Sequence, residues 1–135
     1  MRMKCKILLL ALAVGAVSCG GDAKTELFNG RDLTGWVCVT AGGPVAAEVF
    51  TVQDGCIRVA GQPFGFLRTA EQYGDYRLHA EWRWIGKPSN SGLFQRIQEG
   101  DELWPSLIEC QLESGNAGDL LGLGGATMAG VESPE

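Results

Sequence analysis

Two stretches in which polar and apolar residues alternate with a period of two constrain the fold most. In YRLHAEWRWI, residues 76–85, the alternation places Leu78, Ala80, Trp82 and Trp84 opposite Arg77, His79, Glu81 and Arg83. In WPSLIECQLESGNAGD, residues 104–119, the alternation places Glu109, Gln111 and Glu113 opposite Ile108, Cys110 and Leu112. Successive side chains of a β-strand point to opposite faces, so both stretches predict strands with one polar face.

The rest of the chain predicts further strands separated by turns. Asp54-Gly55, between 49–53 and 56–60, is a strong hairpin signal. No helical period follows the first 18 residues. The expected strands are 36–40, 49–53, 56–60, 66–69, 76–85, 92–98 and one that begins after Pro105. Short strands with frequent turns are typical of an all-β protein, and we expect an antiparallel β-sandwich.

The first 18 residues predict a signal peptide. Three basic residues precede the apolar run from Ile7 to Val17, which is too short to span a membrane after processing. Ala16 to Cys19 is similar to a bacterial lipobox, and residues 19–26 suit a flexible tether. We expect a signal helix, export, and a lipid anchor on Cys19 that holds the protein to a bacterial membrane, in the periplasm or on the outer-membrane surface. Ordinary cleavage with an incidental cysteine is the alternative.

Charge and cysteine content exclude several classes of partner. Loss of residues 1–18 leaves eight basic and sixteen acidic residues, a formal charge of −8. Such a polyanion is a poor binder of nucleic acid. Cys38, Cys56 and Cys110 lack the close spacing of a zinc site. We expect no metal centre, although calcium held by Glu109, Glu113 or Asp119 stays open, as does a disulfide between two of the three cysteines.

The end of the sequence predicts an incomplete domain. LGLGGATMAGVESPE, residues 121–135, is rich in glycine and alanine, and we expect no strand in it. About seven strands leave the edges of a sandwich open. The expected organisation is a signal peptide at 1–18, a tether at 19–26, a partial β-sandwich at 27–123 and an irregular tail at 124–135.

The candidate site residues lie on three of the expected strands and beside them. Glu109 and Glu113 would be about 13 Å apart on one strand, too far for the carboxyl pair of a standard glycosidase. Gln111 between them cannot ionise. Carboxylate, amide, guanidinium and aromatic groups on one face suit a polyhydroxylated ligand. The substrate-binding candidates are Gln111, Arg96, Asn90, Glu81, His79, Glu113 and Trp104.

Other interpretations of these residues are weaker. His79 is the single histidine, and no serine stands in a nucleophile elbow, so a serine–histidine–acid triad is disfavoured. The polar row at 77–83 alone would be a solvated face with incidental ion pairs. The GLGG segment at 122–125 lacks the lysine of a phosphate loop and is expected to be a turn.

Five segments together resemble the 3-keto-disaccharide hydrolase family of bacterial secreted and lipid-anchored proteins. They are LFNGRDLTGW at 27–36, VQDGCIRVAG at 52–61, YGD at 73–75, NSG at 90–92 and IECQLESGNAGD at 108–119. The resemblance implies a concanavalin A-like lectin or glucanase sandwich, a jelly roll whose concave sheet binds carbohydrate. The family continues beyond the region matched here, which implies that this chain covers the first half to two-thirds of the domain.

The chemistry that the resemblance implies needs one base. A ketone at C3 of a sugar acidifies the C2 proton, so a base can remove it and the C1 substituent can leave. We expect Glu109 to be the catalytic base, Arg96 and Asn90 to position the substrate or stabilise the enolate, and Glu81 and His79 to be secondary candidates. The cofactor is unknown. The alternatives are a non-catalytic carbohydrate-binding lipoprotein and an inactive fragment of the family.

Overall fold

The fold is all-β and antiparallel, as predicted from the alternation. The computed structural model describes residues 2–9, 24–41, 46–98, 100 and 102–130. Within them, one short helix, α1 (Ala46–Val49), accompanies ten strands, and every strand pairing is antiparallel. The chain divides into an N-terminal unit, Met1–Arg83, and a C-terminal unit, Trp84–Glu135.

The N-terminal unit contains two sheets. The larger has the order β2-β1-β5-β4, with β7 also paired to β1. Its strands are β1 (Arg2–Leu9), β2 (Lys24–Glu26), β4 (Phe50–Gln53), β5 (Cys56–Val59) and β7 (Tyr76–Arg83). The smaller sheet pairs β3 (Trp36–Thr40) with β6 (Gly65–Thr69).

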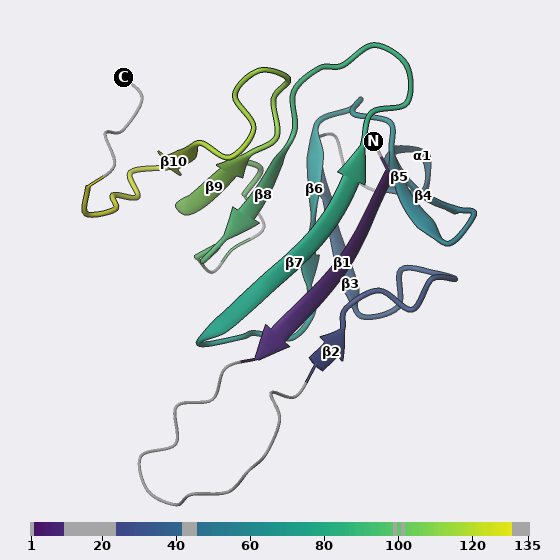
Figure 1. The fold of residues 1–135 in the computed structure, drawn as a ribbon, viewed down its shortest axis with the longest axis horizontal. Helices are drawn as coiled ribbons and strands as arrows, with labels where there is room; N and C mark the ends of the chain where they lie inside the picture. The colour runs from purple at the N-terminus through teal and green to yellow at the C-terminus, as the bar shows by residue number, and fades with distance from the viewer. Residues whose placement is uncertain (1, 10–23, 42–45, 99, 101, 131–135) are drawn as a thin grey trace, which may run out of the picture. The chain divides into compact units, whose positions relative to one another are not determined.

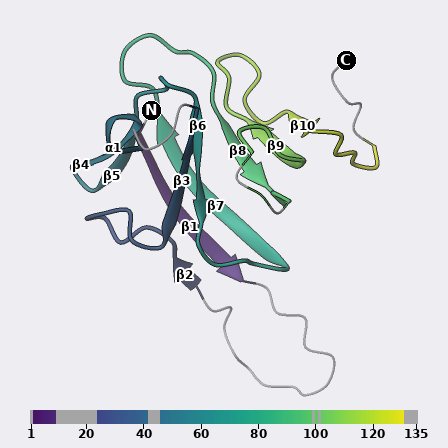
Figure 2. The ribbon, with the colours of Figure 1, turned by 180° about the vertical axis from the view of Figure 1, so that it is seen from behind.

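The two sheets of this unit form two layers, the arrangement of a β-sandwich. In Figure 1, β3 and β6 lie behind β1 and β7, and the view from behind in Figure 2 brings them forward. Both sheets supply buried side chains: Phe50 and Ile57 from the larger, Val39 and Phe66 from the smaller. The core of the unit therefore draws apolar residues from both layers.

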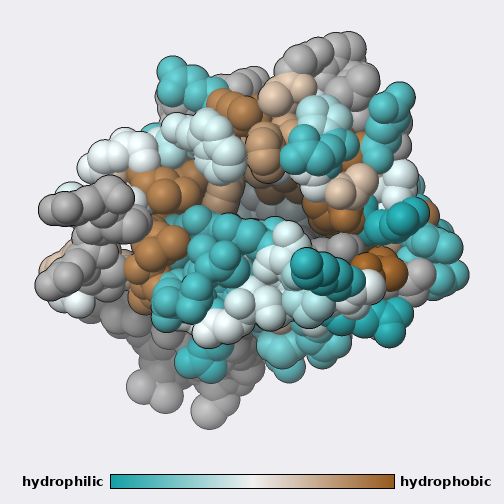
Figure 3. Space-filling view, turned by 90° about the horizontal axis from the view of Figure 1, so that it is seen from above, coloured by the Kyte–Doolittle hydropathy of each residue, from teal (hydrophilic) through white to brown (hydrophobic). Residues whose placement is uncertain are grey.

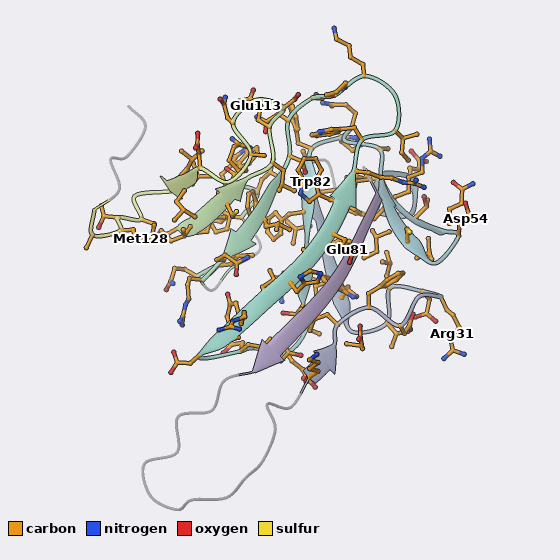
Figure 4. All side chains as sticks on the ribbon, viewed as in Figure 1. Arg31, Asp54, Glu81, Trp82, Glu113 and Met128 are labelled. Carbon is orange, nitrogen blue, oxygen red and sulfur yellow. The ribbon has the colours of Figure 1, made fainter. Side chains whose placement is uncertain are left out.

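The alternation in β7 has the predicted outcome. Leu78, Ala80 and Trp82 are half-buried, while the charged residues between them are exposed. Figure 4 labels Glu81 and Trp82, successive residues on this strand. The strand ends at Arg83, two residues earlier than expected.

The Asp54-Gly55 hairpin is also confirmed. Both residues have positive φ, 52° and 68°, at the turn between β4 and β5. Two positive φ values match the twist of a two-residue hairpin loop, which is why a glycine follows the aspartate there. Asp54 lies at the tip of this hairpin (Figure 4).

The LFNGRDLTGW segment is a hydrogen-bonded turn that leads into β3. The side-chain oxygen of Asn29 accepts hydrogen bonds from the backbone N–H groups of Arg31 and Asp32, at 2.8 and 3.0 Å. The indole N–H of Trp36 donates to the carbonyl of Leu27 at 3.0 Å. Asparagine and aspartate stabilise turns through such bonds, so this motif has a structural role.

The N-terminus differs from the expected signal helix, because Arg2–Leu9 form strand β1. All eight residues are paired with β7, and the register sets Met3 opposite Trp82 and Ile7 opposite Leu78. The edge of β7 offers N–H and C=O groups that a neighbouring strand satisfies, and the alternation of polar and apolar residues from Arg2 to Ile7 suits that pairing. Lys24–Glu26, expected in the tether, form β2. Residues 10–18 and Cys19 lie outside the described residues, so cleavage and lipidation stay predictions.

The C-terminal unit contains a three-stranded sheet with the order β10-β9-β8. Its strands are β8 (Gly92–Gln95), β9 (Leu107–Gln111) and β10 (Leu120–Leu123). Strand β10 corrects the expectation that no strand follows residue 120. The apolar residues of LLGL pair with β9, and the turn begins only at Gly124 and Gly125, which have positive φ.

Some large apolar side chains remain at the surface. Phe64, Ile85, Trp104 and Leu120 are each more than two-fifths exposed. Figure 3 shows hydrophobic residues among hydrophilic ones on the face it presents. No helix among the described residues is long and apolar enough to cross a membrane.

Candidate functional site

Glu109 occupies the middle of the three-stranded sheet. It lies on the central strand, β9, with Phe94 of β8 directly opposite on one side and Leu121 of β10 on the other. Residues directly opposite on neighbouring strands share a face, so the carboxylate stands between an aromatic and an aliphatic side chain. The register thus places an ionisable group in an apolar row.

The environment of Glu109 disfavours its charge. Its side chain is half-buried, and desolvation by burial raises the pKa of its carboxyl. Among the described residues, no side chain or backbone group forms a hydrogen bond or ion pair with this carboxylate. A desolvated carboxylate without a partner is costly for folding, and such groups gather at functional sites.

The face that carries Glu109 is more enclosed than the alternation alone predicted. Leu107 and Gln111, which share that face, are 1% and 7% exposed, whereas Ile108 and Cys110 on the other face are half-buried. The polar face expected for this strand is therefore partly buried and includes the apolar Leu107. Glu109 is the ionisable group on this face of β9, and the residues on either side of it are buried.

The side chain of Gln111 forms hydrogen bonds with the backbone of the two residues that follow it. Its side-chain oxygen accepts hydrogen bonds from the backbone N–H groups of Leu112 and Glu113, both at 2.9 Å. Just beyond the end of β9, the Gln111 oxygen is thus the acceptor for the Glu113 N–H and a second acceptor for the Leu112 N–H, which also donates to the Ser91 carbonyl. The amide oxygen of Gln111 is therefore already engaged, which weighs against its expected role in substrate binding.

Asn90 and Glu113 come together at one end of the sheet. The strand ends at Gln111, but backbone hydrogen bonds from Leu112 to Ser91 and from Ser114 to Ser89 continue the register of β8 and β9. That register sets Asn90 opposite Glu113. The Glu113 carboxylate accepts a hydrogen bond from the side-chain amide of Asn116 at 2.7 Å, and Glu113 lies in the loop after β9 (Figure 4).

Arg96 is the first residue after β8, and the alternation of side chains between the two faces of the strand stops there. Its φ of 55° is unusual for a residue with a side chain, and β8 stops at Gln95. The expected strand at 92–98 therefore ends before Arg96. Arg96 is exposed beside the sheet, and its carbonyl accepts a hydrogen bond from the Gln98 side chain at 3.1 Å.

Trp104 extends the apolar row to the surface. Its ring lies 6.4 Å from that of Phe94, measured between centroids, at an interplanar angle of 59°. The side chain is 57% exposed. Because Phe94 stands opposite Glu109, the exposed Trp104 ring and the carboxylate both adjoin the same aromatic residue, and an aromatic ring of this kind can stack on a sugar.

Glu81 and His79 form a separate candidate group in the N-terminal unit. The imidazole Nε2 of His79 and a carboxylate oxygen of Glu81 are 3.4 Å apart, and the two side chains are 62% and 68% exposed, respectively. An exposed pair of this kind contributes little to stability. Their geometry agrees with a solvated outer face of β7.

The described residues hold no group of three or more histidine, cysteine or acidic side chains arranged for a metal ion. Cys38, Cys56 and Cys110 are free thiols, each half-buried. Desolvation raises the pKa of the Cys38 thiol, so this side chain is held in its neutral form.

The family match covers most of the chain. The model of the 3-keto-alpha-glucoside-1,2-lyase-like domain matches residues 23–132. The chain belongs to this family. No curated protein and no solved structure gives a match. The match agrees with the resemblance found in the sequence, and it supports a carbohydrate-related function that involves 3-keto-glycosides.

One residue of the site, Gly92, was missed as a site residue when the sequence was considered alone. The side chain of Glu109 extends from β9 over this glycine of β8, and an added Cβ at Gly92 would overlap the carboxylate. A glycine inside a strand marks a close approach by another group, and that signal was present in the NSG triplet of this lyase-like domain.

Proposed function

We propose that this protein cleaves 3-keto-glycosides by elimination, with Glu109 as the general base. The observation that carries the proposal is the half-buried carboxylate between Phe94 and Leu121, whose pKa is raised by burial. A carboxylate with a raised pKa is a stronger base for removing a proton from carbon. The family to which the chain belongs supports the substrate class.

The proposed reaction proceeds through an enolate. The Glu109 carboxylate removes the proton from C2, and the electron pair of the C2–H bond moves into the C2–C3 bond as the C3 carbonyl becomes an enolate oxygen. The enolate then re-forms the carbonyl and a C1–C2 double bond while the C1–O bond breaks, and the departing oxygen takes up a proton. Addition of water across the double bond completes a net hydrolysis.

Other residues of the C-terminal unit have proposed supporting roles. The Arg96 guanidinium and the Asn90 amide are donors that suit an enolate oxygen or sugar hydroxyls. Trp104 offers an exposed ring for stacking beside Phe94. Glu113 at the end of the sheet is a further acceptor for hydroxyls. Together these groups would hold a sugar with its C2 proton toward the base.

The test compares Glu109→Gln with the unmodified protein on a 4-nitrophenyl 3-keto-glucoside. We expect turnover to fall by about 10² to 10⁴-fold, the usual contribution of a general base. Exchange of the C2 proton with deuterated solvent should fall in parallel. Glu102→Gln, an exposed carboxylate in the same unit, is the matched control and should retain full activity. Equal activity of Glu109→Gln and wild type would refute the proposal.

A carbohydrate-binding protein without catalysis is the second candidate function. The exposed Trp104 ring beside Phe94 favours it, because binding modules hold sugars on such aromatic surfaces. Titration with 3-keto-glucosides separates the two functions. Binding without turnover by the wild-type protein, weakened by Trp104→Ala, would support this candidate over the lyase.

We also propose that the protein is exported and anchored to a bacterial membrane through a lipid on Cys19. The basic start, the apolar run and the cysteine at the end of that run support this localisation. Cells that express the protein with an alkyne-tagged fatty acid should label the wild type and not Cys19→Ala. Labelling of both would refute the anchor at this residue.

A further inference from the structure

We propose that Gly92 positions the base, because its missing side chain creates the space in which the Glu109 carboxylate lies against β8. This inference rests on the proposed function, since it concerns the orientation of the same carboxylate. Gly92 is a positioning residue under this proposal, and it acts through Glu109.

The geometry that supports the inference is a close approach between two strands. A Cβ built on Gly92 would lie 2.5 Å from Cδ and 2.7 Å from Cγ of Glu109 and would overlap the carboxylate oxygen Oε1. Contacts this short do not occur between real carbon atoms, so either β8 or the glutamate would have to move. The side chain of Glu109 is the movable part, since Gly92 is held by its pairing with Gln111.

The choice of glycine at this position is not explained by backbone conformation. Gly92 does not have a positive φ, unlike the turn glycines of the chain, so any residue could adopt its backbone. Glycine inside a strand is unfavourable, because it packs no side chain and costs conformational entropy. The close approach of the glutamate is therefore the feature that accounts for the glycine.

The space over Gly92 also keeps the carboxylate among uncharged neighbours. On the face of the sheet that carries Glu109, β8 presents Gly92 and Phe94, β9 presents Leu107 and Gln111, and β10 presents Leu121 and Leu123. Three charged residues follow or precede these strands closely in the sequence but lie beyond the strand ends: Arg96, Glu113 and Asp119. A side chain at position 92 would push the carboxylate out of this row and toward solvent.

The test is Gly92→Ala, with Gly74→Ala as the matched control. Gly74 also lacks a positive φ and has open space around its Cα, so alanine fits there. We expect Gly92→Ala to lower kcat for the 3-keto-glucoside by about 10²-fold with little change in KM, since a misplaced catalytic group costs about that much. The pKa of Glu109, measured by NMR on carboxyl-labelled protein, should fall toward its ordinary value. Gly74→Ala should change neither quantity.

A double-mutant cycle keeps the inference testable if Gly92→Ala folds poorly. With Glu109→Ala in place the clash is gone, so the change in unfolding temperature that Gly92→Ala causes should differ between the wild-type and Glu109→Ala backgrounds. An equal change in both backgrounds, or an unchanged Glu109 pKa in Gly92→Ala, would overturn the role of Gly92.

The two proposals fail in different ways. A wild-type protein without turnover, whose Glu109 pKa nevertheless falls in Gly92→Ala, would refute the lyase function and support the positioning of the carboxylate. Loss of activity in Glu109→Gln together with full activity in Gly92→Ala would support the lyase function and overturn the role of Gly92.

Discussion

At the residue scale, two carboxylates show how environment sets ionisation in this protein. Glu109 has a raised pKa because it is desolvated. Asp32 has a pKa lowered to about 2, mainly because the Asn29 side chain and Thr34 donate hydrogen bonds to it. The first carboxylate is set up for chemistry, and the second holds a turn in its ionised form.

Glu109→Gln should stabilise the fold at neutral pH while it removes activity. A raised folded-state pKa means that the native protein binds the proton more tightly, so stability is greatest below the ordinary value of 4.5 and declines as the pH rises through the folded pKa. The neutral amide escapes that loss. Unfolding temperatures should be higher for the variant at pH 7 and similar for both proteins near pH 4. A variant that is less stable at pH 7 would contradict the assignment.

Asp32→Ala should have the opposite pH dependence. The depressed pKa adds stability that is present above the ordinary value of 3.8 and disappears as the pH falls toward about 2. We therefore expect the variant to be less stable than wild type at pH 7, with the difference shrinking through this window, as measured by chemical denaturation at each pH. A constant difference at every pH would show that the charge of Asp32 is irrelevant.

At the scale of elements, β9 shows where alternation was informative and where it failed. The period of two correctly grouped Glu109 with Gln111, because the strand includes both. It did not reveal which face of the strand is buried, because burial depends on packing. Leu107 and Gln111, which share the face of Glu109, are both buried. It also extended the strand face through Arg96 on β8, although a positive φ there ends the strand. Strand ends depend on local backbone geometry that hydropathy does not encode.

Gln111→Leu tests the structural role of the amide at the end of β9. Leucine cannot accept the hydrogen bonds from Leu112 and Glu113, so the Glu113 N–H loses its acceptor, whereas the Leu112 N–H keeps the Ser91 carbonyl. We expect a loss of about 1–3 kcal/mol in the free energy of unfolding, measured with denaturant. Unchanged stability combined with weaker sugar binding would instead support the substrate-binding role expected from the sequence.

At the scale of the whole molecule, β1 is the strand that joins the others of the larger sheet, because it has three partner strands among the described residues. It pairs with β7 along eight residues and also with β2 and β5. The proposed cleavage before Cys19 would remove this strand and leave the edge of β7 without that partner. The consequences of processing therefore reach the N-terminal unit as a whole.

A protein of residues 20–135 tests this dependence directly. We expect it to unfold at a lower denaturant concentration than the full chain, and the amides of β7 to exchange hydrogen faster, because their partners in β1 are gone. Cooperative unfolding of the shorter protein would argue against an inactive fragment. Identical exchange in β7 for both proteins would show that β1 does not protect this edge.

Sequence patterns were enough to predict the fold class, the β4–β5 hairpin, the alternating strand β7 and the family, because period, turn residues and motifs are local properties of the chain. The folded structure was needed to show that β1 joins the sheet, that β10 forms, that the Gln111 side chain bonds to the backbone just beyond β9 and that Glu109 lies over Gly92. Those features depend on which strands become neighbours and in what register. Residues distant in sequence set that register, and no local pattern specifies it.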